Sequence, residues 1–213
     1  MFISELFSSI QGEGSFAGLP AFFIRFSGCN LSCPYCDTKG SRCLKDGAIM
    51  TPEEIISTKD FSFFSDICIS GGEPMCQSDA LCSLLEAIPD EKRVSIETNG
   101  SFSLEKLREK FPDVYLSVDW KLPSSGSDSF KMENLNCIAP RGWLKLVVSD
   151  DKDLNFIEKN KTELSKFSGK IFISPVSRSS KKQFKKISDF VIEKQNIMRL
   201  RIQFQLHKIM GIS

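Results

Sequence analysis

Residues 20–36, PAFFIRFSGCNLSCPYC, join an apolar, strand-like run to a loop that holds three cysteines. Phenylalanine and isoleucine dominate residues 20–27, which predicts a buried strand. Cys29, Cys33 and Cys36 follow at once with the spacing Cys-x3-Cys-x2-Cys. The surrounding glycine, asparagine and proline favour a loop. Because disulfides are rare in a reducing compartment, this clustering indicates metal or redox chemistry rather than three free core thiols.

The composition is that of an ordinary globular protein. The 213 residues are 41% hydrophobic and 26% charged, with a formal net charge of +1, and we expect one domain over residues 1–213. This balance gives no general attraction to nucleic acid or anionic membrane. The basic residues 177–186, SRSSKKQFKK, are typical of a solvated helix face rather than of a tRNA-binding patch. Without a membrane-length apolar run or a signal peptide, we expect a cytoplasmic protein.

Strand-like and helix-like segments alternate along the rest of the chain, which predicts parallel strands joined by helical crossovers. About six such units predict an α/β fold, an open, partial (β/α)6-type barrel whose ligands lie at the carboxyl ends of the strands. Further strands are expected at 66–70, 93–100, 114–120, 143–149, 170–176 and 198–206. Helices are expected from Thr51, over 78–88, from Ser103 as N-cap, and within 150–164 and 180–195.

Three thiolates are suited to an iron–sulfur cluster with one open position. They can bind three irons of a [4Fe–4S] cluster and leave the fourth iron free for another ligand. Thiolates also suit zinc, but a structural zinc site normally has four protein ligands. Cys43 is the nearby alternative as a fourth ligand, whereas His207, the one histidine, lies far along the chain. A non-catalytic zinc module therefore remains an alternative.

Two motifs together resemble the radical S-adenosylmethionine (SAM) superfamily. The first is the cysteine motif, with the aromatic Tyr35 before its last cysteine. The second is Gly71-Gly72-Glu73-Pro74, at the end of the next expected strand, where glycines let the backbone approach a ligand closely. The resemblance implies that the open iron binds SAM and that one electron cleaves the sulfonium to a 5′-deoxyadenosyl radical.

Longer matches resemble the 7-carboxy-7-deazaguanine synthase family within that superfamily. They include residues 7–30 (FSSIQGEGSFAGLPAFFIRFSGCN), 97–100 (ETNG), 119–126 (DWKLPSSG) and 205–208 (QLHK). The resemblance implies a carbon–nitrogen lyase that converts 6-carboxy-5,6,7,8-tetrahydropterin to 7-carboxy-7-deazaguanine, with loss of ammonia, for queuosine and other deazapurines. It also implies a flavodoxin or ferredoxin as electron donor and a homodimer. The alternative enzyme is a radical activase that makes a glycyl radical on a partner protein.

The resemblance also implies roles for individual residues, and it implies no protein acid or base as catalyst. Cys29, Cys33 and Cys36 would bind the cluster, and Thr38 would bind Mg²⁺. SAM would contact Asp37, Thr38, Gly72, Glu73, Asp119, Trp120, Lys121, Ser174, Pro175, Val176 and Ser177. The pterin would contact Ile10, Gln11, Gly12, Glu13, Arg25, Ser70, Glu97, His207 and Ser213. An amide and a carboxylate suit the guanidine-like edge of a pterin, and an arginine suits its carboxylate.

Overall fold

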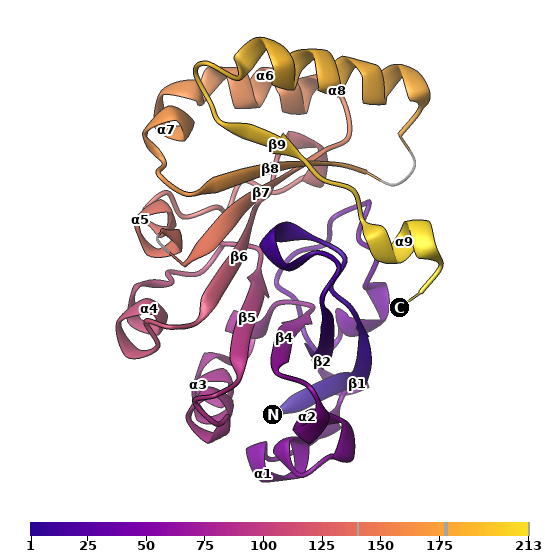
Figure 1. Ribbon diagram of the computed structural model, residues 1–213, viewed down its shortest axis with the longest axis vertical. Helices are drawn as coiled ribbons and strands as arrows, with labels where there is room; N and C mark the ends of the chain where they lie inside the picture. The colour runs from indigo at the N-terminus through magenta and orange to yellow at the C-terminus, as the bar shows by residue number, and fades with distance from the viewer. Residues whose placement is uncertain (140, 177–178, 213) are drawn as a thin grey trace.

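The computed structural model describes residues 1–139, 141–176 and 179–212, and these residues contain one nine-stranded sheet (Figure 1). The strands are Phe2–Ile10 (β1), Pro20–Phe26 (β2), Ala48–Ile49 (β3), Asp66–Gly71 (β4), Arg93–Thr98 (β5), Tyr115–Trp120 (β6), Gly142–Val148 (β7), Lys170–Pro175 (β8) and Leu200–Ile202 (β9). Their order is β3-β1-β2-β4-β5-β6-β7-β8-β9. In this order, every neighbouring pair from β2 to β9 is parallel. Strand β1 is antiparallel to both of its neighbours, β2 and β3. In the part of the chain that the structure describes, the edge strands β3 and β9 do not pair with each other, so the predicted open barrel is confirmed.

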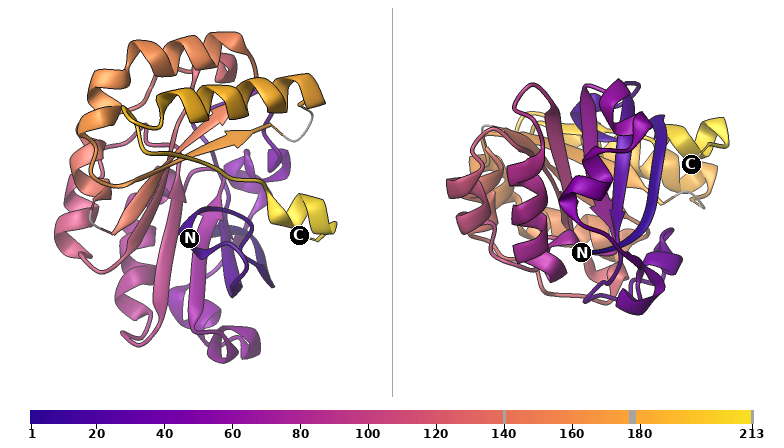
Figure 2. Two further views of the ribbon diagram at one scale, coloured as in Figure 1. Left: turned by 45° about the horizontal axis from the view of Figure 1, so that its top comes forward. Right: turned by 90° about the horizontal axis from the view of Figure 1, so that it is seen from below.

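Helical connections join successive parallel strands and cover one face of the sheet. The helices are Pro52–Ile56 (α1), Lys59–Phe63 (α2), Ser78–Ala87 (α3), Glu105–Lys110 (α4), Asn134–Ile138 (α5), Asp151–Lys159 (α6), Lys161–Lys166 (α7), Lys181–Lys194 (α8) and Leu206–Met210 (α9). Helices α3 to α8 follow the outer face of the curved sheet, whereas α9 lies on the other side, beside β1 and β2 (Figures 1 and 2). Within the described residues, no helix has the length and apolar character that a membrane span requires.

Alternate residues of the parallel strands point to opposite faces of the sheet. In β2, Phe22, Ile24 and Phe26 belong to the main hydrophobic core. Phe23 and Arg25, between them, line a cavity on the concave face. The other strands repeat this alternation and contribute to the core Ile67, Ile69, Ile96, Leu116, Val118, Leu144, Leu146, Ile171 and Ile173. The position of a residue along its strand therefore decides whether it packs in the core or lines the cavity.

Two predicted helix starts have different outcomes. Thr51 caps α1 as expected: its side chain accepts a hydrogen bond from Glu54 N, and its own N–H donates to the Glu54 carboxylate at 2.8 Å. Ser103 is not the N-cap of α4, because Leu104 occupies that position. Leu104 is fully buried and its N–H donates to Asn134 Oδ1 at 2.9 Å, so core packing fixes the start of this helix.

The connection between β1 and β2, residues 11–19, folds into the concave side of the barrel, and we call it the floor loop. Hydrogen bonds of 2.8 Å from Gln11 N to Leu19 O and from Gly18 N to Gln11 O close it. Phe16 packs edge-on against Tyr115 and Trp143, which lie at the starts of β6 and β7. The loop therefore fills the amino end of the barrel and leaves the carboxyl end open. Strand β1 and helix α9 were not predicted from the sequence.

Candidate active site

A cavity of about 660 Å³ lies at the carboxyl ends of the parallel strands, where the sequence predicted a site. It collects side chains from the floor loop, the cysteine loop, the strand ends and α9. The predicted site residues that line it are Ile10, Gln11, Gly12, Glu13, Arg25, Cys29, Cys33, Cys36, Asp37, Thr38, Ser70, Gly72, Glu97, Asp119, Lys121, Ser174, Pro175, Val176 and His207. Ser177 and Ser213 lie outside the described residues.

The three cysteines of the motif reach the same part of this cavity as free thiols. Burial raises the pKa of the Cys29 thiol, and the nearby thiols of Cys33 and Cys36 raise it further. Burial also raises the pKa of Cys33. Thiols with raised pKa values become thiolates when a bound metal supplies positive charge. Three clustered thiols in one partly enclosed cavity fit a [4Fe–4S] cluster.

The zinc alternative has no support from the geometry. Cys43 is exposed and does not line the cavity. Among residues 1–139, 141–176 and 179–212, no three His, Cys, Asp or Glu side chains converge as ligands of a single metal ion. An iron–sulfur cluster does not need such convergence, because each of its irons takes one thiolate.

The double glycine at the end of β4 has a structural reason that the sequence did not reveal. A Cβ on Gly71 would collide with the backbone of Phe26. A Cβ on Gly72 would collide with the carbonyl oxygen of Gly28 and would lie 2.6 Å from that of Ser41. The N–H groups of Gly72 and Glu73 donate to Phe26 O and Gly28 O at 3.0 and 2.8 Å. The glycines therefore allow the end of β4 to pack against the start of the cysteine loop.

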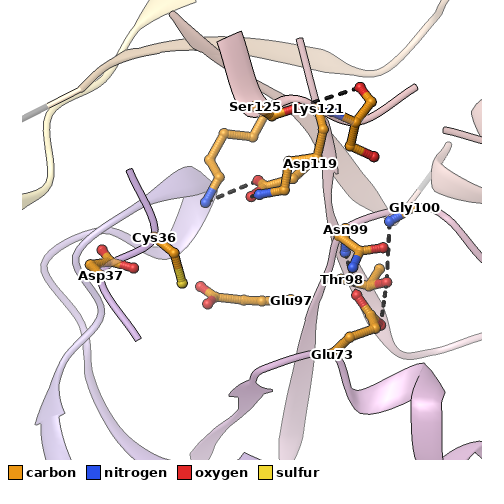
Figure 3. Close-up of polar contacts among 12 residues, drawn as sticks. Cys36, Asp37, Glu73, Glu97, Thr98, Asn99, Gly100, Asp119, Lys121 and Ser125 are labelled. Atoms are coloured by element: carbon orange, nitrogen blue, oxygen red, sulfur yellow. Dashed lines mark hydrogen bonds and ion pairs between the residues drawn. The ribbon is translucent and has the colours of Figure 1, made fainter. Parts of the chain in front are cut away.

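Glu73 does not line the cavity, and its predicted contact with SAM stays a prediction. Its buried carboxylate accepts hydrogen bonds from Thr98 Oγ1 at 2.7 Å, from Asn99 N at 2.6 Å and from Met75 N at 3.0 Å. Figure 3 shows it turned toward Thr98, Asn99 and Gly100, whereas Glu97 points toward the side of Cys36 and Asp37. Glu73 thus links the ends of β4 and β5.

Trp120 does not line the cavity either, whereas its neighbours Asp119 and Lys121 do. The indole of Trp120 is buried in the main core and stacks on Phe130 at 4.7 Å between ring centroids. Side chains alternate along β6, so a strand that presents Asp119 to the cavity must turn Trp120 to the core. Lys121 Nζ lies 2.6 Å from Asp119 Oδ2 (Figure 3).

Lys145 in β7 is a cavity residue that the sequence analysis missed. Its ammonium lies 2.7 Å from Glu13 Oε2 and 3.0 Å from Asp119 Oδ1, and only 8% of the residue is exposed. The sheet register places Lys145 directly opposite Asp119. Burial lowers the pKa of Lys145, but the charges of Asp119 and Glu13 outweigh it and raise the pKa well above its usual value. A lysine within the apolar run WLKLVV was the available signal.

Helix α9 and the residue before it cover the floor-loop side of the cavity. Gln205 Nε2 donates to Glu13 Oε1 at 2.6 Å, and Leu206 N donates to Gly12 O at 3.1 Å. Lys208 forms an ion pair of 2.7 Å with Asp37. A Cβ on Gly12 would collide with the imidazole of His207, so a glycine is needed at this contact. Gln205 and Lys208 lie in the QLHK motif but were not predicted as site residues.

Two charged side chains on the strands, Glu97 and Arg25, form a further part of the cavity wall. Glu97 accepts a hydrogen bond of 2.7 Å from Ser70 Oγ, and burial raises the pKa of Glu97 against the lowering effect of Lys145. Arg25 is held at 2.7 Å by Glu5, with its guanidinium carbon 5.1 Å from the ring centroid of Phe7. The cavity thus presents carboxylates, cations and hydroxyls around an apolar patch of Phe7 and Phe23.

Comparison with known proteins defines the class first. Residues 23–119 match the family model "Radical SAM superfamily", and this segment contains the three cysteines and the double glycine. The chain is 37% identical over its full length to a 7-carboxy-7-deazaguanine synthase from Methanospirillum hungatei, covering 86% of that protein. It is 39% identical to the Clostridium acetobutylicum 7-carboxy-7-deazaguanine synthase, covering 97% of this chain and 94% of that one. The chain therefore belongs to the 7-carboxy-7-deazaguanine synthase family.

The fold has a counterpart among solved structures. The crystal structure of QueE from Escherichia coli superposes with a TM-score of 0.71, over 97% of this chain and 94% of that chain, at 24% identity. This likeness supports the open-barrel architecture. Family membership implies an iron–sulfur cluster and SAM, which the three thiols and the cavity above them fit.

Proposed function

We propose that the cavity binds 6-carboxy-5,6,7,8-tetrahydropterin and converts it to 7-carboxy-7-deazaguanine with loss of ammonia. The observation that carries this proposal is that one cavity joins the three cluster thiols to Gln11, Glu13 and Arg25. The cluster and SAM supply one-electron radical chemistry when bound. The chain itself binds the pterin, orients its C6 hydrogen and excludes water.

The cavity residues divide this work by chemistry. The carboxylate of Glu13 and the amide of Gln11 suit the guanidine-like edge of the pterin, and Arg25 suits its carboxylate. Ser70, Glu97 and His207 complete the substrate side. We assign SAM to the side of the cavity that lies between the cysteine loop and the ends of β6 and β8. Its proposed contacts are Asp37, Thr38, Gly72, Asp119, Lys121, Ser174, Pro175 and Val176.

Mg²⁺ is a further proposed component, held by Thr38 and the substrate carboxylate. The Thr38 hydroxyl lines the cavity and makes two long hydrogen bonds, one of 3.4 Å to Gly71 O and one of 3.7 Å with Cys36 Sγ. Mg²⁺ commonly keeps waters and takes oxygens from substrate, so one protein hydroxyl is a sufficient anchor. Thr38→Ala should raise the Mg²⁺ concentration needed for half-maximal activity and leave the iron content unchanged. A Mg²⁺ requirement unaltered by the substitution would remove Thr38 from this role.

The remaining proposals concern partners and location. A flavodoxin or ferredoxin is the proposed electron donor, a homodimer the proposed assembly, and the cytoplasm the proposed compartment. Helix α8 carries the lysines of the basic run 177–186, for which a solvated helix face was expected. Two of its lysines pair with acids, Lys185 with Asp189 and Lys186 with Asp151, which supports a surface role rather than tRNA binding.

An anaerobic turnover assay tests the proposed activity. Cluster-reconstituted protein is mixed with SAM, a chemical reductant, Mg²⁺ and the carboxytetrahydropterin, and products are followed by mass spectrometry. We expect 7-carboxy-7-deazaguanine and ammonia, and we expect Cys33→Ala to lose both the product and the brown colour of the cluster. A reconstituted protein that binds its cluster but leaves the pterin unchanged would overturn the proposal.

A further inference from the structure

Glu13 is the proposed substrate residue whose surroundings are most fully specified. Only 8% of the Glu13 residue is exposed, and it lies in the floor loop, just before the helical turn Gly14–Phe16. Oε2 accepts from Lys145 Nζ at 2.7 Å and from Gln203 Nε2 at 3.3 Å. Oε1 accepts from Gln205 Nε2 at 2.6 Å. An ionised carboxylate offers about two acceptor positions on each oxygen, so Oε2 is fully used by the protein and Oε1 is not.

Lys145 fixes this orientation from a rigid element. It lies within β7, whereas Gln203 and Gln205 lie in the segment after β9. Within the described residues, Lys145 is the one cation that forms an ion pair with Glu13. Asp119, which also pairs with Lys145, has Lys121 as a second cation at 2.6 Å. Loss of Lys145 would therefore leave Glu13 without a cation but would leave Asp119 paired.

We infer that Lys145 is a positioning residue of the substrate site, acting through Glu13. By occupying Oε2 it holds the buried carboxylate in one orientation and leaves Oε1 available to an N–H of the substrate edge. The inference rests on the proposed function, because it takes Glu13 to be a substrate contact. If Lys145 acts in this way, the affinity for the substrate should depend on Lys145 strongly, and the affinity for SAM should depend on it only weakly.

The test compares Lys145→Met with Lys145→Arg in the cluster-reconstituted enzyme. Methionine keeps the apolar stem and removes the charge, whereas arginine keeps the charge. Lys145→Met should raise KM for the pterin about 10- to 100-fold, the loss expected for one charge-assisted hydrogen bond. The dissociation constant of SAM, measured by equilibrium dialysis, should stay within about threefold, because Asp119 keeps Lys121. Lys145→Arg should recover most of the loss in KM.

Two further variants separate positioning from general stability. Lys92→Met removes a lysine that donates to three backbone carbonyls, those of Phe61, Ser62 and Phe64, away from the cavity lining. It should lower the melting temperature without changing KM. In a Glu13→Gln background the added Lys145→Met change should have little further effect on KM, because the residue through which Lys145 acts is already neutral. This double variant has no unpaired buried carboxylate at position 13, so it remains informative if Lys145→Met alone does not fold.

The outcomes distinguish this inference from the proposed function. An unchanged KM in Lys145→Met, or equal losses of pterin and SAM affinity that Lys145→Arg does not recover, would overturn the positioning role. Full additivity of Glu13→Gln and Lys145→Met would also overturn it. If the unaltered enzyme did not convert the pterin at all, the proposed function would fail first.

Discussion

Gly72 shows how much a single residue can be constrained by neighbouring backbone. A side chain there would meet the carbonyls of Gly28 and Ser41, both beside the cysteine loop. We expect Gly72→Ala to destabilise the fold by about 1–3 kcal/mol and to lower the iron bound on reconstitution, because the loop must shift. Gly40→Ala is the matched control, since no atom lies within 4 Å of its added Cβ. Equal melting temperatures and iron contents for the two variants would contradict this account.

His207 should make stability depend on pH. Burial lowers its pKa below the usual 6.5, more than the charges of Glu13 and Asp37 raise it. The folded chain therefore favours neutral imidazole and binds a proton less readily than the unfolded chain. Its contribution to stability is present above the unfolded pKa of about 6.5 and is lost as the pH falls through the lower folded pKa. As the pH is lowered through this range, the melting temperature should fall more steeply for the unaltered protein than for His207→Gln. Parallel curves of melting temperature against pH would contradict the assignment.

The sequence predicted most of the cavity residues, and its misses at this scale follow from strand geometry. Trp120 was placed with Asp119 and Lys121 because the three are adjacent, but alternation along β6 sends it to the core. The same alternation would have picked out Lys145, which shares a face with Val147. Glu73 could not be placed from sequence, because two of its three hydrogen-bond donors, Thr98 Oγ1 and Asn99 N, become neighbours only when β4 and β5 pair.

At the scale of elements, the carboxylate of Glu73 joins the turn after β4 to the end of β5, in addition to the direct pairing of the two strands. Both its oxygens accept from donors, so glutamine in its place would turn an NH₂ toward one of them. We expect Glu73→Gln to lower the free energy of unfolding by about 1–3 kcal/mol, measured by denaturant titration. The exposed Glu86, paired with Lys110 on the surface, supplies the control Glu86→Gln, for which we expect a change within about 0.5 kcal/mol. Similar losses of unfolding free energy in Glu73→Gln and Glu86→Gln would show that Glu73 does not link the ends of β4 and β5.

The parallel strands were predictable because their apolar runs alternate with amphipathic helices. Strand β1 was not, because residues 2–10 mix polar and apolar side chains and pair with a neighbour that becomes adjacent only in the hairpin. Helix α9 has five residues, none of them fully buried, so no periodic pattern marks it. Its place follows from tertiary contacts such as Lys208 with Asp37.

At the scale of the whole molecule, an open barrel brings three distant segments to one cavity. The floor loop fills the amino end, the cysteine loop lies at the carboxyl end, and α9 covers the side near β1 and β2 (Figure 1). This arrangement leaves the space above the three thiols lined by polar side chains rather than by a fourth cysteine. The proposed radical chemistry therefore depends on a cluster that the protein would ligate through three thiolates, with one iron open to SAM.

Mössbauer spectroscopy of ⁵⁷Fe-reconstituted protein, with and without SAM, tests this claim most directly. We predict a [4Fe–4S] cluster in which one iron differs from the other three and changes its isomer shift when SAM binds. A cluster with four equivalent irons that SAM leaves unchanged would contradict the account.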